Sequence, residues 1–132
     1  MPVSMLQGST LFVVSTPIGN LNDISLRAIE VLKAVQVIAA EDTRQTQKLL
    51  NHYGITTRLS AFHDFSDQSA AQRLIRRLNN GDSVALVSDA GTPLISDPGY
   101  GLVAAARRGG LAVIPIPGPS AFVAALSVAG LP

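Results

Sequence analysis

The sequence predicts an α/β fold, a three-layer sandwich in which helices cover both faces of a five-stranded, mainly parallel sheet. Short apolar runs alternate along the chain with segments whose apolar residues recur at helical spacing. The runs are built from Ala, Val, Leu and Ile, as expected of parallel strands that are buried on both faces. Three of them are followed by loops of glycine, proline and small hydroxyl residues.

The expected strands are the apolar runs at residues 11–14, 35–39, 58–62, 83–87 and 112–116. Helical segments separate them, which gives five successive βα units. Because the connection between two parallel strands is right-handed, such units form one sheet with helices on both faces.

The first two helices follow the first two strands. Asp23 is expected to cap a helix in which apolar residues between 24 and 35 share one face. A polar helix over residues 42–52 is expected next, and Gly54 closes it.

The remaining helices have clear start and stop signals. Residues 69–72, Ser-Ala-Ala-Gln, fit a capping box that opens a helix ending at residues 79–81. Asp97-Pro98 is expected to cap and start the next helix, since proline is favoured at the first helical position. The last helix is expected over residues 119–129, before Gly130.

The amino-acid composition limits the classes of protein to which this chain can belong. A chain of 132 residues, 47% hydrophobic and 14% charged, suits one domain with a substantial core, and no apolar run is long enough for a membrane span. The absence of cysteine excludes disulfides and thiolate metal sites and makes the cytoplasm the expected location. A net charge of +1 does not indicate a nucleic-acid binder, so any RNA phosphates must be met by a local patch or by parts outside this chain.

Three loops are expected to form a small-molecule pocket, because ligands of α/β sheets bind beyond the carboxyl ends of the strands. The loop at 16–21 matches neither a dinucleotide fingerprint nor a phosphate loop, and is either a stiff pocket wall or only a turn. The loop at 88–99 offers main-chain groups, and its Asp89 either faces a ligand or binds its own loop amides. The loop at 117–121 opens a helix, whose free N–H groups favour an anion.

Two further segments carry polar candidates. Asp42 is expected either to cap its helix or to face the pocket, while Glu41 and Arg44 on its two sides are expected to face the pocket. His63 and Asp64 form a candidate acid–base pair, with a solvated histidine as the alternative. Two histidines without a carboxylate cluster argue against a metal site.

Four ordered motifs together resemble the tetrapyrrole methylase superfamily. They lie at residues 14–24, 40–44, 88–99 and 117–121, and the resemblance runs from about Leu11 to Pro132. Members bind S-adenosylmethionine in a trough between two α/β domains and usually form homodimers. The resemblance therefore implies that residues 1–132 are an N-terminal methyltransferase domain with half of the cofactor site. The C-terminal domain is missing from this chain, which ends just after a helix stop, so methyl transfer is expected to need the longer protein.

The first loop distinguishes the branches of this superfamily. Tetrapyrrole and diphthine members carry Gly-x-Gly-Pro-Gly-Asp-Pro where this chain reads Thr-Pro-Ile-Gly-Asn-Leu at residues 16–21. The departure favours the branch that methylates the ribose 2′-hydroxyl of a cytidine in 16S ribosomal RNA, with that RNA or the small ribosomal subunit as partner. The alternatives are a tetrapyrrole C-methyltransferase and a non-enzymatic module that binds an adenine-containing metabolite.

The resemblance also implies roles for individual residues. The expected cofactor-binding residues are Pro17, Gly19, Asp89, Ala90, Gly91, Thr92, Ile95, Ser96, Gly118, Pro119, Ser120 and Ala121. Glu41, Asp89 and His63 are the candidates for a catalytic base or hydrogen-bond acceptor. Asn20 and Arg44 are expected to face the RNA.

Overall fold

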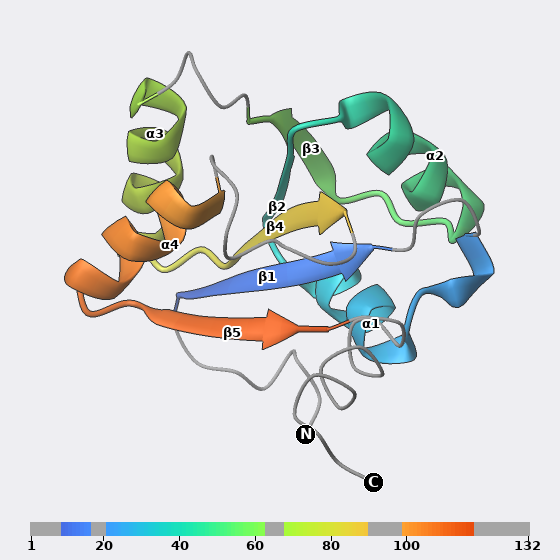
Figure 1. Ribbon diagram of the computed structural model, residues 1–132, viewed down its shortest axis with the longest axis horizontal. Coiled ribbons are helices and arrows are strands. Elements are labelled where there is room, and N and C mark those ends of the chain that lie inside the picture. The colour runs from blue at the N-terminus through green and yellow to red at the C-terminus, as the bar shows by residue number, and fades with distance from the viewer. Residues whose placement is uncertain (1–8, 17–20, 63–67, 90–98, 118–132) are drawn as a thin grey trace, which may run out of the picture.

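The computed structural model describes residues 9–16, 21–62, 68–89 and 99–117. Its five strands form one sheet, and every neighbouring pair is parallel. They are β1 (Thr10–Thr16), β2 (Val37–Ala40), β3 (Arg58–Ala61), β4 (Val84–Asp89) and β5 (Ala112–Ile116), in the spatial order β3-β2-β4-β1-β5 (Figure 1). The predicted parallel sheet is confirmed.

Helices separate the strands as expected. Those in the described ranges are the short 3-10 helix η2 (Leu21–Asp23) and the α-helices α1 (Leu26–Ala34), α2 (Thr43–His52), α3 (Gln68–Asn79) and α4 (Gly99–Arg108). The predicted cap at Asp97 and the helix over residues 119–129 lie outside the described residues.

The observed starts of the helices contradict two of the predicted caps. Asp23 does not cap α1, because it lies in η2; Ser25 is the cap, and its Oγ accepts a hydrogen bond from Ala28 N at 3.1 Å. The prediction that a capping box at Ser69 opens the third α-helix is also wrong, since α3 already includes Gln68. Asp42 does cap α2, where its carboxylate accepts a hydrogen bond from Gln45 N at 3.1 Å.

The second strand starts later than predicted. Val35 is the residue that ends α1, and its N–H donates to Val31 O at 3.1 Å. The strand therefore begins at Val37 rather than at residue 35. An apolar residue at the end of a helix and one at the start of a strand look alike in sequence, and the last helical hydrogen bond decides between them.

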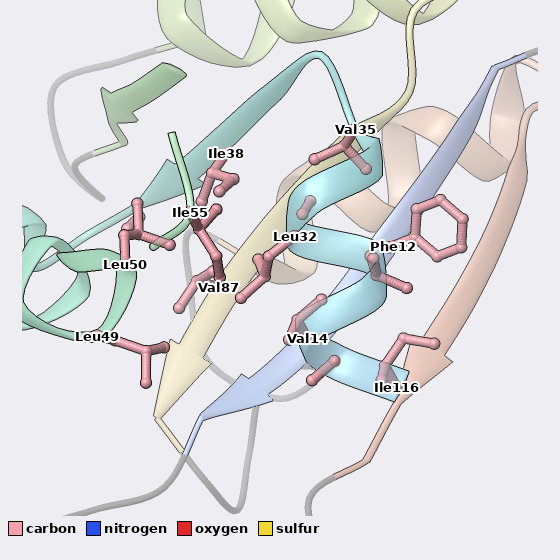
Figure 2. Close-up of a cluster of buried hydrophobic side chains, with 14 of the residues drawn as sticks. Phe12, Val14, Leu32, Val35, Ile38, Leu49, Leu50, Ile55, Val87 and Ile116 are labelled. Atoms are coloured by element: carbon pink, nitrogen blue, oxygen red, sulfur yellow. The ribbon is translucent and has the colours of Figure 1, made fainter. Parts of the chain in front are cut away.

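Helices cover both faces of the sheet, which makes three layers. Side chains alternate between the faces along each strand. One set packs with α1 and α2 and includes Phe12, Val14, Ile38, Ala40, Ala85 and Val87 (Figure 2). The alternate set packs with α3 and α4 and includes Leu11, Val13, Val37, Ala39, Val84 and Leu86. The predicted sandwich is confirmed.

Hydrogen bonds at the amino edge of the sheet align three strands. Ser83 Oγ accepts from Thr10 N at 3.3 Å, and Gln36 Oε1 accepts from Ser83 N at 2.6 Å. Gln36 N in turn donates to Ser83 O at 3.1 Å. These contacts tie together the starts of β1, β2 and β4, and so help to set where the same strands end at the opposite edge.

Candidate functional site

The carboxyl ends of β1 and β4 form the centre of the candidate site. Their register pairs Thr16 with Asp89, the last residues of the two strands. After β1 the chain continues to α1 on one face, and after β4 it continues to α4 on the other. Adjacent parallel strands whose connections leave on opposite faces create a crevice at their carboxyl ends, where α/β proteins bind ligands.

The end of β2 lies on the other side of β4 and repeats this arrangement. Ala40 pairs with Val87 in the β2–β4 ladder, and the chain leaves β2 toward α2, on the face opposite α4. The topology that favours a ligand site therefore occurs on both sides of β4, and Asp89 ends that strand.

The structure brings two of the predicted catalytic residues to adjacent strand ends. Glu41 directly follows β2 and is exposed. The pairing of Ala40 with Val87 places Glu41 level with Ser88, one residue before Asp89. The backbone before Glu41 is held by a hydrogen bond from Phe62 N to Ala40 O at 2.9 Å.

Arg44 lies at the same edge of the sheet. It is exposed in the first turn of α2, two residues after the cap Asp42. The cap role explains Asp42 and leaves Glu41 and Arg44 as the polar residues of this segment whose positions suit a ligand.

The other predicted site residues lie outside the described residues, but the strands that carry their loops are neighbours. They are Pro17, Gly19, Asn20, His63, Ala90, Gly91, Thr92, Ile95, Ser96, Gly118, Pro119, Ser120 and Ala121. The three predicted cofactor loops follow β1, β4 and β5, which are adjacent in the sheet. Val14 pairs with Ile116, so β5 also ends at this edge.

Tyr53 is a supporting residue that sequence reasoning missed. Its hydroxyl donates to Leu21 O at 2.5 Å, which fixes the residue where the chain enters η2 after the first loop. The two residues are 32 positions apart, so no local sequence signal connects them.

The end of β1 carries two buried polar residues. Ser15 and Thr16 are buried, with relative exposures of 5% and 9%. At the described ends of β1, β4 and β5 no lysine or arginine occurs.

Among the residues that the structure describes, no three His, Cys, Asp or Glu side chains gather as a metal site, and no helix is long and apolar enough to cross a membrane.

Comparison with known proteins identifies relatives over nearly the whole chain. Residues 10–132 match the family described as Tetrapyrrole (Corrin/Porphyrin) Methylases. The chain is 59% identical over 122 residues to ribosomal RNA small subunit methyltransferase I of Escherichia coli O157:H7, a match that covers 92% of this chain and 43% of the relative. The protein of the same name from Xylella fastidiosa is 59% identical over 123 residues, which is 93% of this chain and 45% of the relative.

A solved structure has the same architecture. The crystal structure of uroporphyrin-III-C-methyltransferase from Thermus thermophilus matches with a TM-score of 0.67 at 25% identity, over 93% of this chain and 53% of that one. The chain thus spans less than half the length of the two curated relatives and about half of this structural neighbour.

Proposed function

We propose, since this chain belongs to the tetrapyrrole (corrin/porphyrin) methylase family, that it is the N-terminal domain of an enzyme that transfers a methyl group from S-adenosylmethionine to ribosomal RNA. The observation that carries the proposal is the strand topology: β1 and β4 end side by side, their connections leave on opposite faces, and Glu41 directly follows the neighbouring strand β2. The names of the relatives support small-subunit ribosomal RNA as the substrate.

The acceptor that we infer is the ribose 2′-hydroxyl of a cytidine in 16S ribosomal RNA, on the RNA or in the small subunit. The full-length protein would act in the cytoplasm as a homodimer. Because the chain spans 43% and 45% of the two relatives, we propose that it supplies half of the cofactor site and that a C-terminal domain supplies the rest.

The described part of the crevice fits S-adenosylmethionine. The hydroxyl residues Ser15 and Thr16 lie at the end of β1 and the carboxylate residue Asp89 at the end of β4, without a basic residue at either end. Such groups suit an adenosine and a sulfonium cation better than they suit a polyphosphate, which needs cationic partners. Asp89 and the loops after β1, β4 and β5, with the cofactor residues predicted above, would hold the cofactor.

The protein's part in the reaction is placement and proton handling. Bound S-adenosylmethionine supplies a methyl carbon that its sulfonium centre makes electrophilic. Holding the RNA hydroxyl in line with that carbon contributes about 7–11 kcal/mol of the barrier reduction. A ribose hydroxyl is weakly acidic, so a hydrogen-bond acceptor aids the reaction late in the transfer. We assign this role to Glu41 or Asp89, with His63 as a third candidate, and place Asn20 and Arg44 toward the RNA.

The test separates cofactor binding from chemistry in the full-length protein. The variants are Glu41→Ala and Asp89→Ala, and Glu30→Ala is the matched control because Glu30 is an exposed carboxylate on α1. We expect loss of the acceptor to lower methyl transfer to small subunits by roughly 10²–10⁴-fold. Glu41→Ala should leave cofactor affinity in calorimetry unchanged, whereas Asp89→Ala should lower it.

Two outcomes would contradict this proposal. Wild-type turnover in both variants would show that neither Glu41 nor Asp89 takes part in methyl transfer. Methyl transfer to a uroporphyrinogen-type acceptor, and none to ribosomal subunits, would assign the enzyme to tetrapyrrole methylation, which its structural neighbour's name makes the second candidate. Mapping ribose methylation in ribosomal RNA from cells that lack the protein identifies the nucleotide.

A further inference from the structure

A groove lined by arginines lies between α3 and the edge strand β3. Its volume is about 340 Å³, and its polar lining comprises Arg58, Ser60, Arg73, Arg76, Arg77 and Asn80. Arg58 comes from the strand and the other three arginines from the helix. Arg73, Arg76 and Arg77 follow the i, i+3, i+4 spacing that places residues on one helix face.

The groove concentrates positive charge. Its lining, within the part of the chain that the structure describes, includes four of the chain's ten lysines and arginines and no acidic residue, although the whole chain carries a net charge of only +1. It is therefore a local patch of the kind that meets RNA phosphates, which is one of the two alternatives that the sequence leaves open.

Most of these guanidinium groups have no counter-ion among the residues that the structure describes. Arg77 pairs with Asp82, with 3.3 Å between Nη2 and Oδ2, yet its buried Nε has no hydrogen-bond partner. The exposed side chains of Arg58, Arg73 and Arg76 take part in no ion pair with any residue that the structure describes. Guanidinium groups bind phosphate oxygens in a two-pronged geometry, so a phosphate chain complements this surface.

One end of the groove lies toward the edge of the sheet that carries the candidate site. Ala61 and Ala70 line this end, and Ala61 pairs with Ala40, the residue before Glu41. The helix α3 then returns toward the opposite edge, so Arg76 and Asn80 line the far end. A strand of RNA whose ribose lies at the site can thus continue into the groove.

We propose that this groove binds the phosphate backbone of the ribosomal RNA beside the nucleotide that is methylated. The inference rests on the proposed function above and extends it, because it names the surface that grips the substrate away from the reacting atoms. Arg58, Arg73 and Arg76 make phosphate contacts, and Arg77, which pairs with Asp82, forms part of the groove lining.

The test compares two double variants of the full-length protein that remove the same charge. Arg73→Gln with Arg76→Gln alters the groove, and Arg107→Gln with Arg108→Gln is the control, since both residues are exposed at the end of α4. Affinity for a 16S ribosomal RNA fragment is measured by fluorescence anisotropy at several salt concentrations. Losing two phosphate contacts should weaken binding at 0.15 M salt by roughly 10- to 30-fold and lower the slope of log affinity against log salt by about 1.4–1.8.

The control variant should keep wild-type RNA affinity within about twofold, since it removes no phosphate contact. Both variants should keep wild-type affinity for S-adenosylmethionine. Arg58→Gln tests the opposite wall of the groove with one substitution, and should lower the salt slope by about 0.7–0.9. Thermal midpoints of all variants confirm folding, and Arg58→Gln provides the test if the double variant unfolds.

Three results would overturn the inference. The first is wild-type RNA affinity and salt slope in the folded groove variants. The second is an equal loss in the groove and control variants, which indicates diffuse attraction. The third is a lower assembly mass in light scattering with RNA binding unchanged, which indicates that the groove holds another protein surface. If the wild-type protein neither binds RNA nor methylates it, the proposed function itself fails.

Discussion

Single polar side chains set the helix starts that follow the site strands. The first N–H groups of a helix have no partner within the helix, and a side-chain oxygen at the cap satisfies one of them. Ser25 does so for α1 and Asp42 for α2. Asp23, Ser25 and Asp42 all have suitable side chains, so residue type alone does not select the cap; the 3-10 turn that includes Asp23 leaves Ser25 in the extended conformation of a cap.

We expect Ser25→Ala to lower the free energy of unfolding of the full-length protein by about 1 kcal/mol, because the N–H of Ala28 loses its acceptor. Asp23→Ala, in the exposed η2 turn, should change it by less than about 0.5 kcal/mol. Urea denaturation of both variants measures the two values. Equal losses would show that Asp23 also caps α1.

The sequence predicts a whole helix accurately where apolar residues recur at helical spacing and a stop signal follows them. The predicted polar helix over residues 42–52 is α2, whose buried residues Thr46, Leu49 and Leu50 lie at helical spacing. Gly54 stops it with φ of 66°, a conformation that costs side chains with a Cβ atom about 1–2 kcal/mol. The strand β2 is less well predicted because the apolar run before it is shared with α1.

At the level of elements we predict opposite effects for two glycines. Gly54→Ala should lower the free energy of unfolding by about 1 kcal/mol, because alanine does not favour a positive φ. Gly101→Ala should raise it by about 0.5–1 kcal/mol, since Gly101 lies within α4 and a Cβ there meets no atom within 4 Å. Thermal denaturation checks both values, and a loss at Gly101 would contradict the helical conformation described for it.

The whole molecule depends on a sheet whose strand order differs from the chain order. The strand β4 lies between β1 and β2, and its own connection, to α4, leaves on the face opposite to the connections that follow β1 and β2. The crevice at Asp89 is therefore a property of the whole topology. The two cores share the same strands, so damage to one core weakens the layer that supports the site.

Leu78→Ala tests this coupling. Leu78 is fully buried between α3 and the sheet, and its truncation should lower the free energy of unfolding by about 2–5 kcal/mol. Leu26→Ala is the control and should cost less than about 0.5 kcal/mol, because Leu26 is 79% exposed. Native-state hydrogen exchange should show the loss in β1 as well as in α3, because they form one core. A loss confined to α3 would contradict that coupling.

The sequence by itself determined the elements, the burial of both sheet faces and the loops in which polar residues gather, because these depend on neighbours in the chain. It located Glu41 and Asp89 at strand ends and Arg44 at the start of the helix that follows β2, where the structure places their backbones. It did not determine that β4 separates β1 from β2, that Tyr53 holds Leu21, or that Arg58 faces the arginines of α3. These relations join residues far apart in sequence, and only the packing of helices against a shared sheet decides which distant segments meet.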